Sequence, residues 1–186
     1  MKTLIVYGTR YGATAGTSEE IGKILSNEGL DVKVVNAKEE KIKDISIYDL
    51  IVVGTGVQMG QWTGAIEDFL KKHEKELQTK KLAIFVSSMK TIAEREGKTA
   101  DVESARTWDI DKKLSKYNFK PISVGFFGGV LNYNKMNFFF KKTLGSIREQ
   151  VEKDGFEESE PGVYELRNWD EIRSWAKDLS QIVKSA

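Results

Sequence analysis

The chain has 186 residues, of which 40% are hydrophobic, so it can bury one good core and we expect a single domain. Its 29 basic and 28 acidic residues nearly cancel and are interleaved, which argues against a nucleic-acid-binding protein. The lack of cysteine excludes disulfides and cysteine-held iron–sulfur clusters, and a lone histidine excludes a multi-histidine metal site. Redox chemistry in such a chain would therefore require an organic cofactor.

Neither a targeting signal nor a membrane span is visible in the sequence. The apolar run after Lys2 ends at Gly8 and is too short for the core of a secretory signal. No stretch approaches the ~20 apolar residues that a membrane helix needs. We therefore expect a soluble, cytoplasmic protein.

Short apolar runs separated by helical patterns mark the secondary structure along the chain. The expected strands cover residues 3–8, 31–36, 48–56, 80–88 and 121–127. Apolar residues at helical spacing predict helices after the first strand, around His73, more weakly over about 99–115, and finally over 169–184. This alternation predicts an α/β fold, a doubly wound five-stranded parallel sheet with helices on both faces. Ligands of such sheets bind at the carboxyl ends of the strands, here in the loops 8–14, 54–62, 87–98 and 128–133.

The stretch GTRYGAT, residues 8–14, joins the first strand to the first helix and is rich in glycine and hydroxyl side chains. The first amides of a helix have no partner within the helix, and the helix dipole is positive there, so an anion is favoured. Thr9 and Thr14 add hydroxyl donors, Arg10 can add charge, and Gly12 allows the backbone to approach a ligand closely. The stretch therefore predicts a phosphate-binding loop.

Two common nucleotide loops do not fit this stretch. A P-loop requires a lysine after its last glycine, and none follows Gly12 or Gly16. The dinucleotide fingerprint GxGxxG fails because Gly8, Gly12 and Gly16 are spaced by four. A hydroxyl-rich loop without that lysine suits a terminal phosphomonoester such as that of FMN. The alternative is an ordinary turn with a threonine cap.

GTRYGAT resembles the T/S-x-T-x-G-x-T phosphate loop of the flavodoxin family, with Arg10 in place of the usual second hydroxyl. The similarity extends along essentially the whole chain. It is nearest to the flavodoxin-like branch that contains the menaquinone-dependent protoporphyrinogen dehydrogenases. The features shared with that branch are the T-R-x-G-x-T loop, VVGTGVQMGQW after the third strand and GGVLNYNKMNFFF after the fifth.

The resemblance implies a flavodoxin-like fold and an FMN site built from three loops. The phosphate loop would contribute Thr9, Arg10, Tyr11, Gly12, Ala13 and Thr14. The loops that clamp the flavin ring would contribute Thr55, Gly56, Val57, Gln58, Met59, Gly60, Trp62, Ser87, Ser88, Met89 and Lys90. A peptide flip near Gly56 or Gly60 could present a carbonyl or N–H group to flavin N5. Loop 87–98 departs from the family because it has no tyrosine or tryptophan, and Trp62 could equally open the next helix as a core residue.

The loops at the mouth of this site carry more basic than acidic residues, unlike the strongly acidic mouth of typical electron-carrying flavodoxins. The basic residues are Arg10, Lys90, Arg95 and Lys98. Positive charge near the flavin ring would favour an anionic reduced or semiquinone flavin. We expect this excess of positive charge to face the cofactor.

Residues 128–166 exceed what one connection from a strand to a helix requires, and they form an inserted segment. Its apolar residues fall at helical spacing: Met136, Phe140, Leu144, Ile147 and Val151. This helix could pack on the domain's own core, or the 128–151 segment could form a homodimer face, a partner docking site or a membrane-surface patch. Tyr133, Phe138 and Phe139 would remain for such contacts, and GVYEL (162–166) could return as a short strand.

These observations favour an FMN-dependent electron carrier that shuttles low-potential electrons between redox proteins, because no cluster of catalytic or metal-binding side chains is recognisable. The alternative is an FMN-dependent protoporphyrinogen dehydrogenase that passes electrons to a quinone, which the aromatic insertion and the near-neutral charge favour. A flavin-free domain such as a response regulator would need clustered aspartates where Gly8 and Thr9 stand.

Overall fold

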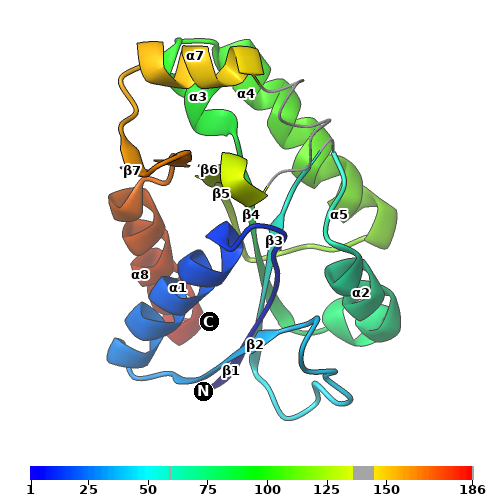
Figure 1. Ribbon diagram of the computed structural model, residues 1–186. Coiled ribbons are helices and arrows are strands. Elements are labelled where there is room, and N and C mark those ends of the chain that lie inside the picture. Colours follow the sequence, from blue (N-terminus) through cyan, green and yellow to red (C-terminus); the bar gives the residue numbers. More distant parts are fainter. Residues whose placement is uncertain (59, 136–144, 186) are drawn as a thin grey trace.

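The strands predicted from the apolar runs pair as one parallel sheet of order β2-β1-β3-β4-β5 (Figure 1). The computed structural model describes residues 1–58, 60–135 and 145–185, with the backbone alone at 145–147. The strands are β1 Lys2–Gly8, β2 Asp31–Asn36, β3 Leu50–Gly56, β4 Lys81–Ser88 and β5 Ser123–Gly128. Each end lies within two residues of its predicted position, and the doubly wound five-stranded parallel sheet is confirmed.

The register of the sheet brings the ends of four strands to one edge. Gly8 at the end of β1 pairs with Thr55 of β3, and the next residue of β3, Gly56, pairs with Ser87 of β4. Ser88 in turn pairs with Gly128 at the end of β5. The loops that follow these four strands therefore meet at the carboxyl edge of the sheet.

Helices cover both faces of the sheet, as predicted. On one face lie α1 (Ala13–Asn27) and α8 (Trp169–Ser185), and on the other lie α2 (Gly64–Leu77) and α5 (Lys112–Tyr117) (Figure 1). The first pair buries apolar side chains that include Ile21, Leu25, Ile172, Ala176 and Leu179 against the sheet. The second face buries a separate cluster that includes Ile66, Phe69, Leu70, Ile110 and Tyr117. The helix predicted for 169–184 is α8.

The segment between β4 and β5 is more divided than predicted. The loop expected at 87–98 contains a short helix, α3 (Lys90–Arg95), and the helix expected at 99–115 consists of α4 (Thr99–Arg106), the π-helix η1 (Thr107–Asp111) and α5. A π-helix has wider turns than an α-helix. This wider turn places Ile110 in the core while the Asp109 carbonyl accepts a hydrogen bond from Trp62 Nε1 at 2.6 Å.

The insertion after β5 forms a small antiparallel sheet of order β6-β8-β7. Its strands are β6 (Val130–Asn132), β7 (Glu158–Glu160) and β8 (Val163–Glu165), and η2 (Tyr133–Lys135) and α7 (Gly145–Lys153) lie between β6 and β7. The short return strand expected at 162–166 is thus present as β8. A third core fills this region with Leu131, Tyr133, Val151, Phe156, Tyr164 and Leu166.

The availability of Tyr133 for partner contacts was predicted wrongly. Its side chain is only 8% exposed, because it packs into the third core with its ring 6.1 Å from that of Tyr164. Met136, Phe138, Phe139, Phe140 and Leu144, and the side chain of Ile147, lie outside the described residues. Among the described residues, no helix is both long and apolar enough to span a bilayer.

Candidate functional site

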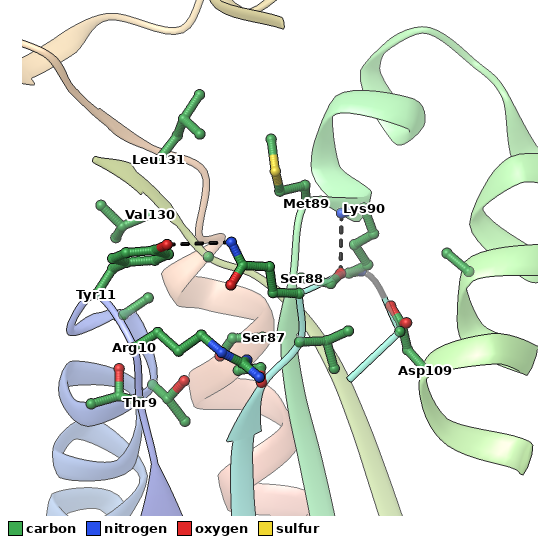
Figure 2. Close-up of a pocket in the computed structure, with 18 of the residues that line it drawn as sticks. Thr9, Arg10, Tyr11, Ser87, Ser88, Met89, Lys90, Asp109, Val130 and Leu131 are labelled. Atoms are coloured by element: carbon green, nitrogen blue, oxygen red, sulfur yellow. Dashed lines mark hydrogen bonds between the residues drawn. The ribbon is translucent and has the colours of Figure 1, made fainter. Parts of the chain in front are cut away.

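The loops at the carboxyl edge of the sheet enclose a cavity of about 410 Å³ (Figure 2). Most of the residues predicted to bind the cofactor line it: Thr9, Arg10, Tyr11, Ala13, Thr14, Gly56, Val57, Gln58, Gly60, Ser87, Ser88, Met89 and Lys90. Gly12, Thr55 and Trp62 lie beside the cavity without lining it, and Met59 lies outside the described residues. Three loops far apart in the sequence therefore meet at one hollow.

The first loop is held in shape by Gly12 and Thr9. Gly12 precedes helix α1 with a φ of 101°, in the left-handed region that favours glycine, and its N–H group donates to Thr9 Oγ1 at 2.9 Å. The amides of Ala13 and Thr14 follow in the first helical turn, where the helix itself offers them no acceptor. The loop thus presents amides and the positive end of the helix dipole toward the cavity.

Thr14 is the residue whose surroundings best fit a phosphate group. The residue is only 1% exposed and lines the cavity, and its Oγ1 lies 3.2 Å from where a Cβ on Gly56 would stand. No described residue forms a hydrogen bond with this hydroxyl. A phosphate oxygen in the loop would provide the missing partner, so the residues present fit the phosphomonoester predicted from the sequence.

Arg10 joins the first loop to the loop after β3 (Figure 2). Its Nη1 donates to the Gly56 carbonyl at 2.9 Å, and its Nη2 donates to the carbonyls of Gln61 and Trp62 at 3.1 and 3.0 Å. Burial lowers the pKa of this guanidinium, which nevertheless stays charged at neutral pH. Arg10 therefore orders the loop after β3. From the sequence, its only expected role was to supply positive charge to the phosphate.

The loop after β3 is a tight turn. Gln58 and Gln61 exchange backbone hydrogen bonds of 3.1 and 3.0 Å across Gly60, which has a φ of 70°. The Gln58 side chain donates to the Tyr11 hydroxyl at 3.3 Å, which ties this turn to the first loop (Figure 2). Tyr11 is the sole aromatic residue among the described residues that line the cavity.

Thr55 and Trp62 take structural positions next to the cavity. The Thr55 hydroxyl is fully buried and accepts a hydrogen bond from the Thr63 amide at 3.2 Å. Trp62 is 3% exposed, packs in the core beneath α2, and donates its indole N–H to Asp109. The geometry thus matches the interpretation of Trp62 as a core residue that opens the next helix.

The excess of positive charge expected around the cofactor is not found in the cavity. The Lys90 ammonium is buried and paired with Glu94 at 2.7 Å and Glu171 at 3.1 Å. Arg95 and Lys98 do not line the cavity, whereas two carboxylates, Asp101 and Asp109, do. Counting charges in the loops alone failed because α4 and η1 add acidic side chains to the wall.

Eight lining residues were not among the predicted binding residues. Gly129 follows β5, and Val130 and Leu131 begin β6, within the segment 128–133 that was expected to be a ligand loop. The others come from α3, α4 and η1: Ala93, Asp101, Val102, Ala105 and Asp109. Their only signal in the sequence is length, because the connection between β4 and β5 is longer than one covering helix requires.

Comparison with known proteins identifies the family. A family model described as a flavodoxin domain matches residues 4–158. The chain belongs to the flavodoxin family. The protein named protoporphyrinogen IX dehydrogenase (quinone) from Escherichia coli strain K12 is 22% identical over 183 residues, which cover 98% of this chain and 96% of that protein.

Solved structures of the flavodoxin fold superpose on the chain. A flavodoxin from the domain Archaea gives a TM-score of 0.56 at 16% identity, with 99% of both chains covered. The rubredoxin oxygen:oxidoreductase of Desulfovibrio gigas gives 0.54 at 16% identity. The match covers 99% of this chain but only 36% of that larger protein, so the likeness concerns one flavodoxin-like part of it. Membership in the flavodoxin family supports a flavin cofactor and, in broad terms, electron transfer.

Proposed function

We propose that the chain, as a single domain over residues 1–186, binds FMN and shuttles electrons between redox partner proteins. The observation that carries this proposal is Thr14, which lines the cavity beside the first amides of α1 and whose hydroxyl has no hydrogen-bond partner among the described residues. A phosphomonoester would pair that hydroxyl and those amides together. Membership in the flavodoxin family supports the same cofactor.

The residues of the cavity divide between the two ends of FMN. Thr9 to Thr14 would hold the phosphate, while Tyr11, the turn after β3 and residues 87–90 would surround the ring system. Bound FMN supplies one-electron and two-electron chemistry. The protein positions it, excludes water from one side through aliphatic residues such as Val57, and fixes the turn after β3 through Arg10.

Thr14→Ala tests the phosphate contact. Losing a hydrogen bond to a charged group should weaken FMN binding by about 1–2 kcal/mol, or roughly 5- to 30-fold in Kd. Thr14→Ser keeps the hydroxyl and should retain most of the affinity. Unchanged affinity in Thr14→Ala would remove this contact from the site. A folded sample that stays colourless after incubation with FMN and dialysis would contradict the proposal as a whole.

A second candidate is an FMN-dependent dehydrogenase that oxidises protoporphyrinogen and passes electrons to a quinone. It is favoured by the full-length similarity to the Escherichia coli protein of that name and by a cavity that extends beyond the predicted flavin loops. An anaerobic assay separates the candidates. Protoporphyrinogen IX and a quinone should turn over with the dehydrogenase, whereas an electron carrier should exchange electrons with ferredoxin-type proteins and leave protoporphyrinogen unoxidised.

A further inference from the structure

Arg167 lies just after the inserted segment, at the junction between β8 and α8. The N–H group of the preceding Leu166 donates to the Gly129 carbonyl at 3.0 Å, which holds this junction beside the end of β5. The Arg167 side chain is only 12% exposed, and its Nη1 donates to the backbone carbonyl of Ala13 at 3.2 Å. A residue next to the insertion therefore contacts the first turn of α1, 154 residues earlier in the chain.

The guanidinium of Arg167 is held on several sides. Its Nε donates to one Glu165 carboxylate oxygen at 2.7 Å, its Nη2 donates to the other oxygen, and its central carbon lies 4.2 Å from the centre of the Trp169 ring. Gly16 makes room for the remaining nitrogen, because a Cβ on that residue would stand 2.8 Å from Nη1. Glycine weakens a helix relative to alanine, so this close approach explains its place inside α1. The fold thus fixes which atom of Arg167 faces Ala13.

The Ala13 carbonyl that accepts from Arg167 belongs to the same peptide group as the Thr14 amide. That amide is among the first of α1, where the helix provides no acceptor. A charged donor on the carbonyl polarises the peptide group and strengthens its N–H group as a donor, because hydrogen bonds in a chain reinforce one another. The Thr17 hydroxyl donates to the same carbonyl at 3.2 Å and adds to the effect. Arg167 thus acts on the phosphate loop without lining the cavity itself.

Glu165 determines how this influence reaches the loop. Its carboxylate pairs with the guanidinium of Arg167, so the two side chains together add no net charge beside α1. A neutral pair exerts little electrostatic force at a distance. The influence of Arg167 is therefore transmitted by its hydrogen bond to the Ala13 carbonyl, and not by a free positive charge.

We propose that Arg167 is a positioning residue that selects the phosphorylated flavin, because it holds and polarises the peptide group between Ala13 and Thr14. The proposal rests on the proposed function, in which this loop binds the phosphate of FMN. Riboflavin has the same ring system but lacks the phosphate, so it gains nothing from the polarised amide. Gly16 takes part as well, since it admits the guanidinium to the Ala13 carbonyl.

The test compares FMN and riboflavin binding to the flavin-free full chain through quenching of flavin fluorescence. The main variant combines Arg167→Met with Glu165→Gln. Removing both charges leaves the net charge unchanged and leaves no unpaired carboxylate beside the loop. We expect FMN to bind roughly fivefold more weakly, since the lost hydrogen bond acts on the phosphate through a peptide group, and riboflavin affinity to stay unchanged.

Gly16→Ala tests the same contact without altering either charged residue. The added methyl group displaces the flexible end of Arg167 from Ala13, and alanine favours the helix, so the variant should stay folded. FMN should again bind roughly fivefold more weakly, with riboflavin unaffected. Arg173→Gln is the matched control. Arg173 also joins α8 to α1, through Glu20 at 2.6 Å, but about two turns further along α1, and its loss should change neither affinity.

A loss of affinity confined to FMN in both test variants supports the proposal. Unchanged FMN affinity in either variant would overturn it. An equal loss for FMN and riboflavin would overturn it too, because that result indicates a general distortion of the site. An unaltered chain that binds FMN while the variants fail these expectations leaves the proposed function standing, whereas an unaltered chain that does not bind FMN contradicts that function first.

Discussion

The guanidinium of Arg10 donates to the backbone carbonyl of Gly56 at 2.9 Å and so fastens the phosphate loop to the loop after β3. Replacing Arg10 with alanine removes this bond and those to Gln61 and Trp62. Because all of these carbonyls lose a charged donor, we expect faster amide hydrogen exchange across residues 56–62. We also expect roughly tenfold weaker FMN binding.

The matched control for this change is Arg106→Ala, since Arg106 is exposed and lies outside the cavity lining. Exchange in 56–62 and FMN affinity should both stay unchanged in that variant. Arg10→Lys is informative as well, because lysine keeps the charge but cannot reach several carbonyls with one planar group. If amide hydrogen exchange in residues 56–62 stays slow in Arg10→Ala, the turn after β3 is stable without the hydrogen bonds from Arg10.

Gly8 ends β1 at a point of very close packing. A Cβ on this residue would stand 2.0 Å from Thr63 Oγ1 at the start of α2. We expect Gly8→Ala to lower the free energy of unfolding by about 1–3 kcal/mol, because the strand end and α2 must separate. Thr63→Ala in the same chain should recover part of the loss. Gly64→Ala is the control, since nothing lies within 4 Å of its Cβ position, and urea unfolding should show it to be neutral or slightly stabilising.

Tyr117 fastens the helical segment after β4 to α2 through a hydrogen bond from its hydroxyl to Glu67 at 2.8 Å. Burial alone would raise the pKa of Glu67, but the hydrogen bonds from Lys113 and Tyr117 outweigh it and hold the pKa below its ordinary value. The carboxylate therefore stabilises the fold above its ordinary pKa, and this contribution is lost as the pH falls. Tyr117→Phe should cost about 1 kcal/mol near neutral pH.

Urea unfolding at about pH 7 and at about pH 3.5 checks this expectation, since the contribution of the Glu67 carboxylate falls as the pH drops below its ordinary pKa and the cost of Tyr117→Phe should be smaller at the lower pH. Tyr48→Phe serves as the control, because the Tyr48 hydroxyl forms no hydrogen bond with any described residue. A loss of the same size at both pH values would mean that packing of the ring, and not the carboxylate, accounts for the stabilisation.

The fold was predictable because its signals are local. Buried parallel strands read as short apolar runs, and the apolar stripe from Ile172 to Val183 defines α8 without knowledge of its neighbours. The phosphate loop was equally accessible, since its glycines, hydroxyls and position after β1 lie within a few residues. These features depend on the nearest residues in the chain, which a single sequence displays.

The parts of the site that escaped prediction depend on contacts between distant residues. The Arg10 guanidinium donates to backbone carbonyls in residues 56–62, which are remote in sequence. The indole N–H group of Trp62 likewise donates to the distant backbone carbonyl of Asp109. Nothing in the local pattern around residue 109 distinguishes a cavity carboxylate from a solvated one. The predicted excess of positive charge around the cavity failed for the same reason, because Lys90 is paired in part with Glu171, which is remote in sequence.

Asp109 should also make the stability of the protein depend on pH. Its pKa is raised to about 6 by burial, so between its ordinary value and about 6 the folded chain holds this proton more firmly than the unfolded chain. The stabilisation is complete at low pH and is lost as the pH rises through about 6. Asp109→Asn cannot ionise and should avoid that loss. It should be more stable than the unaltered protein at about pH 7.5, by on the order of 1 kcal/mol once solvent screening of this half-buried group is allowed for.

Urea unfolding across this pH range measures the gap between the two proteins, which should close as the pH approaches about 4. Asp101→Asn, which removes an exposed carboxylate from the same wall, should show no gap that opens near pH 6. The free energies of unfolding of Asp109→Asn and the unaltered protein could instead differ by the same amount at about pH 4 and at about pH 7.5. That result would mean that the Asp109 carboxyl group does not titrate between these two pH values. Asp109 would then be ruled out as a pH-sensitive group of the cavity.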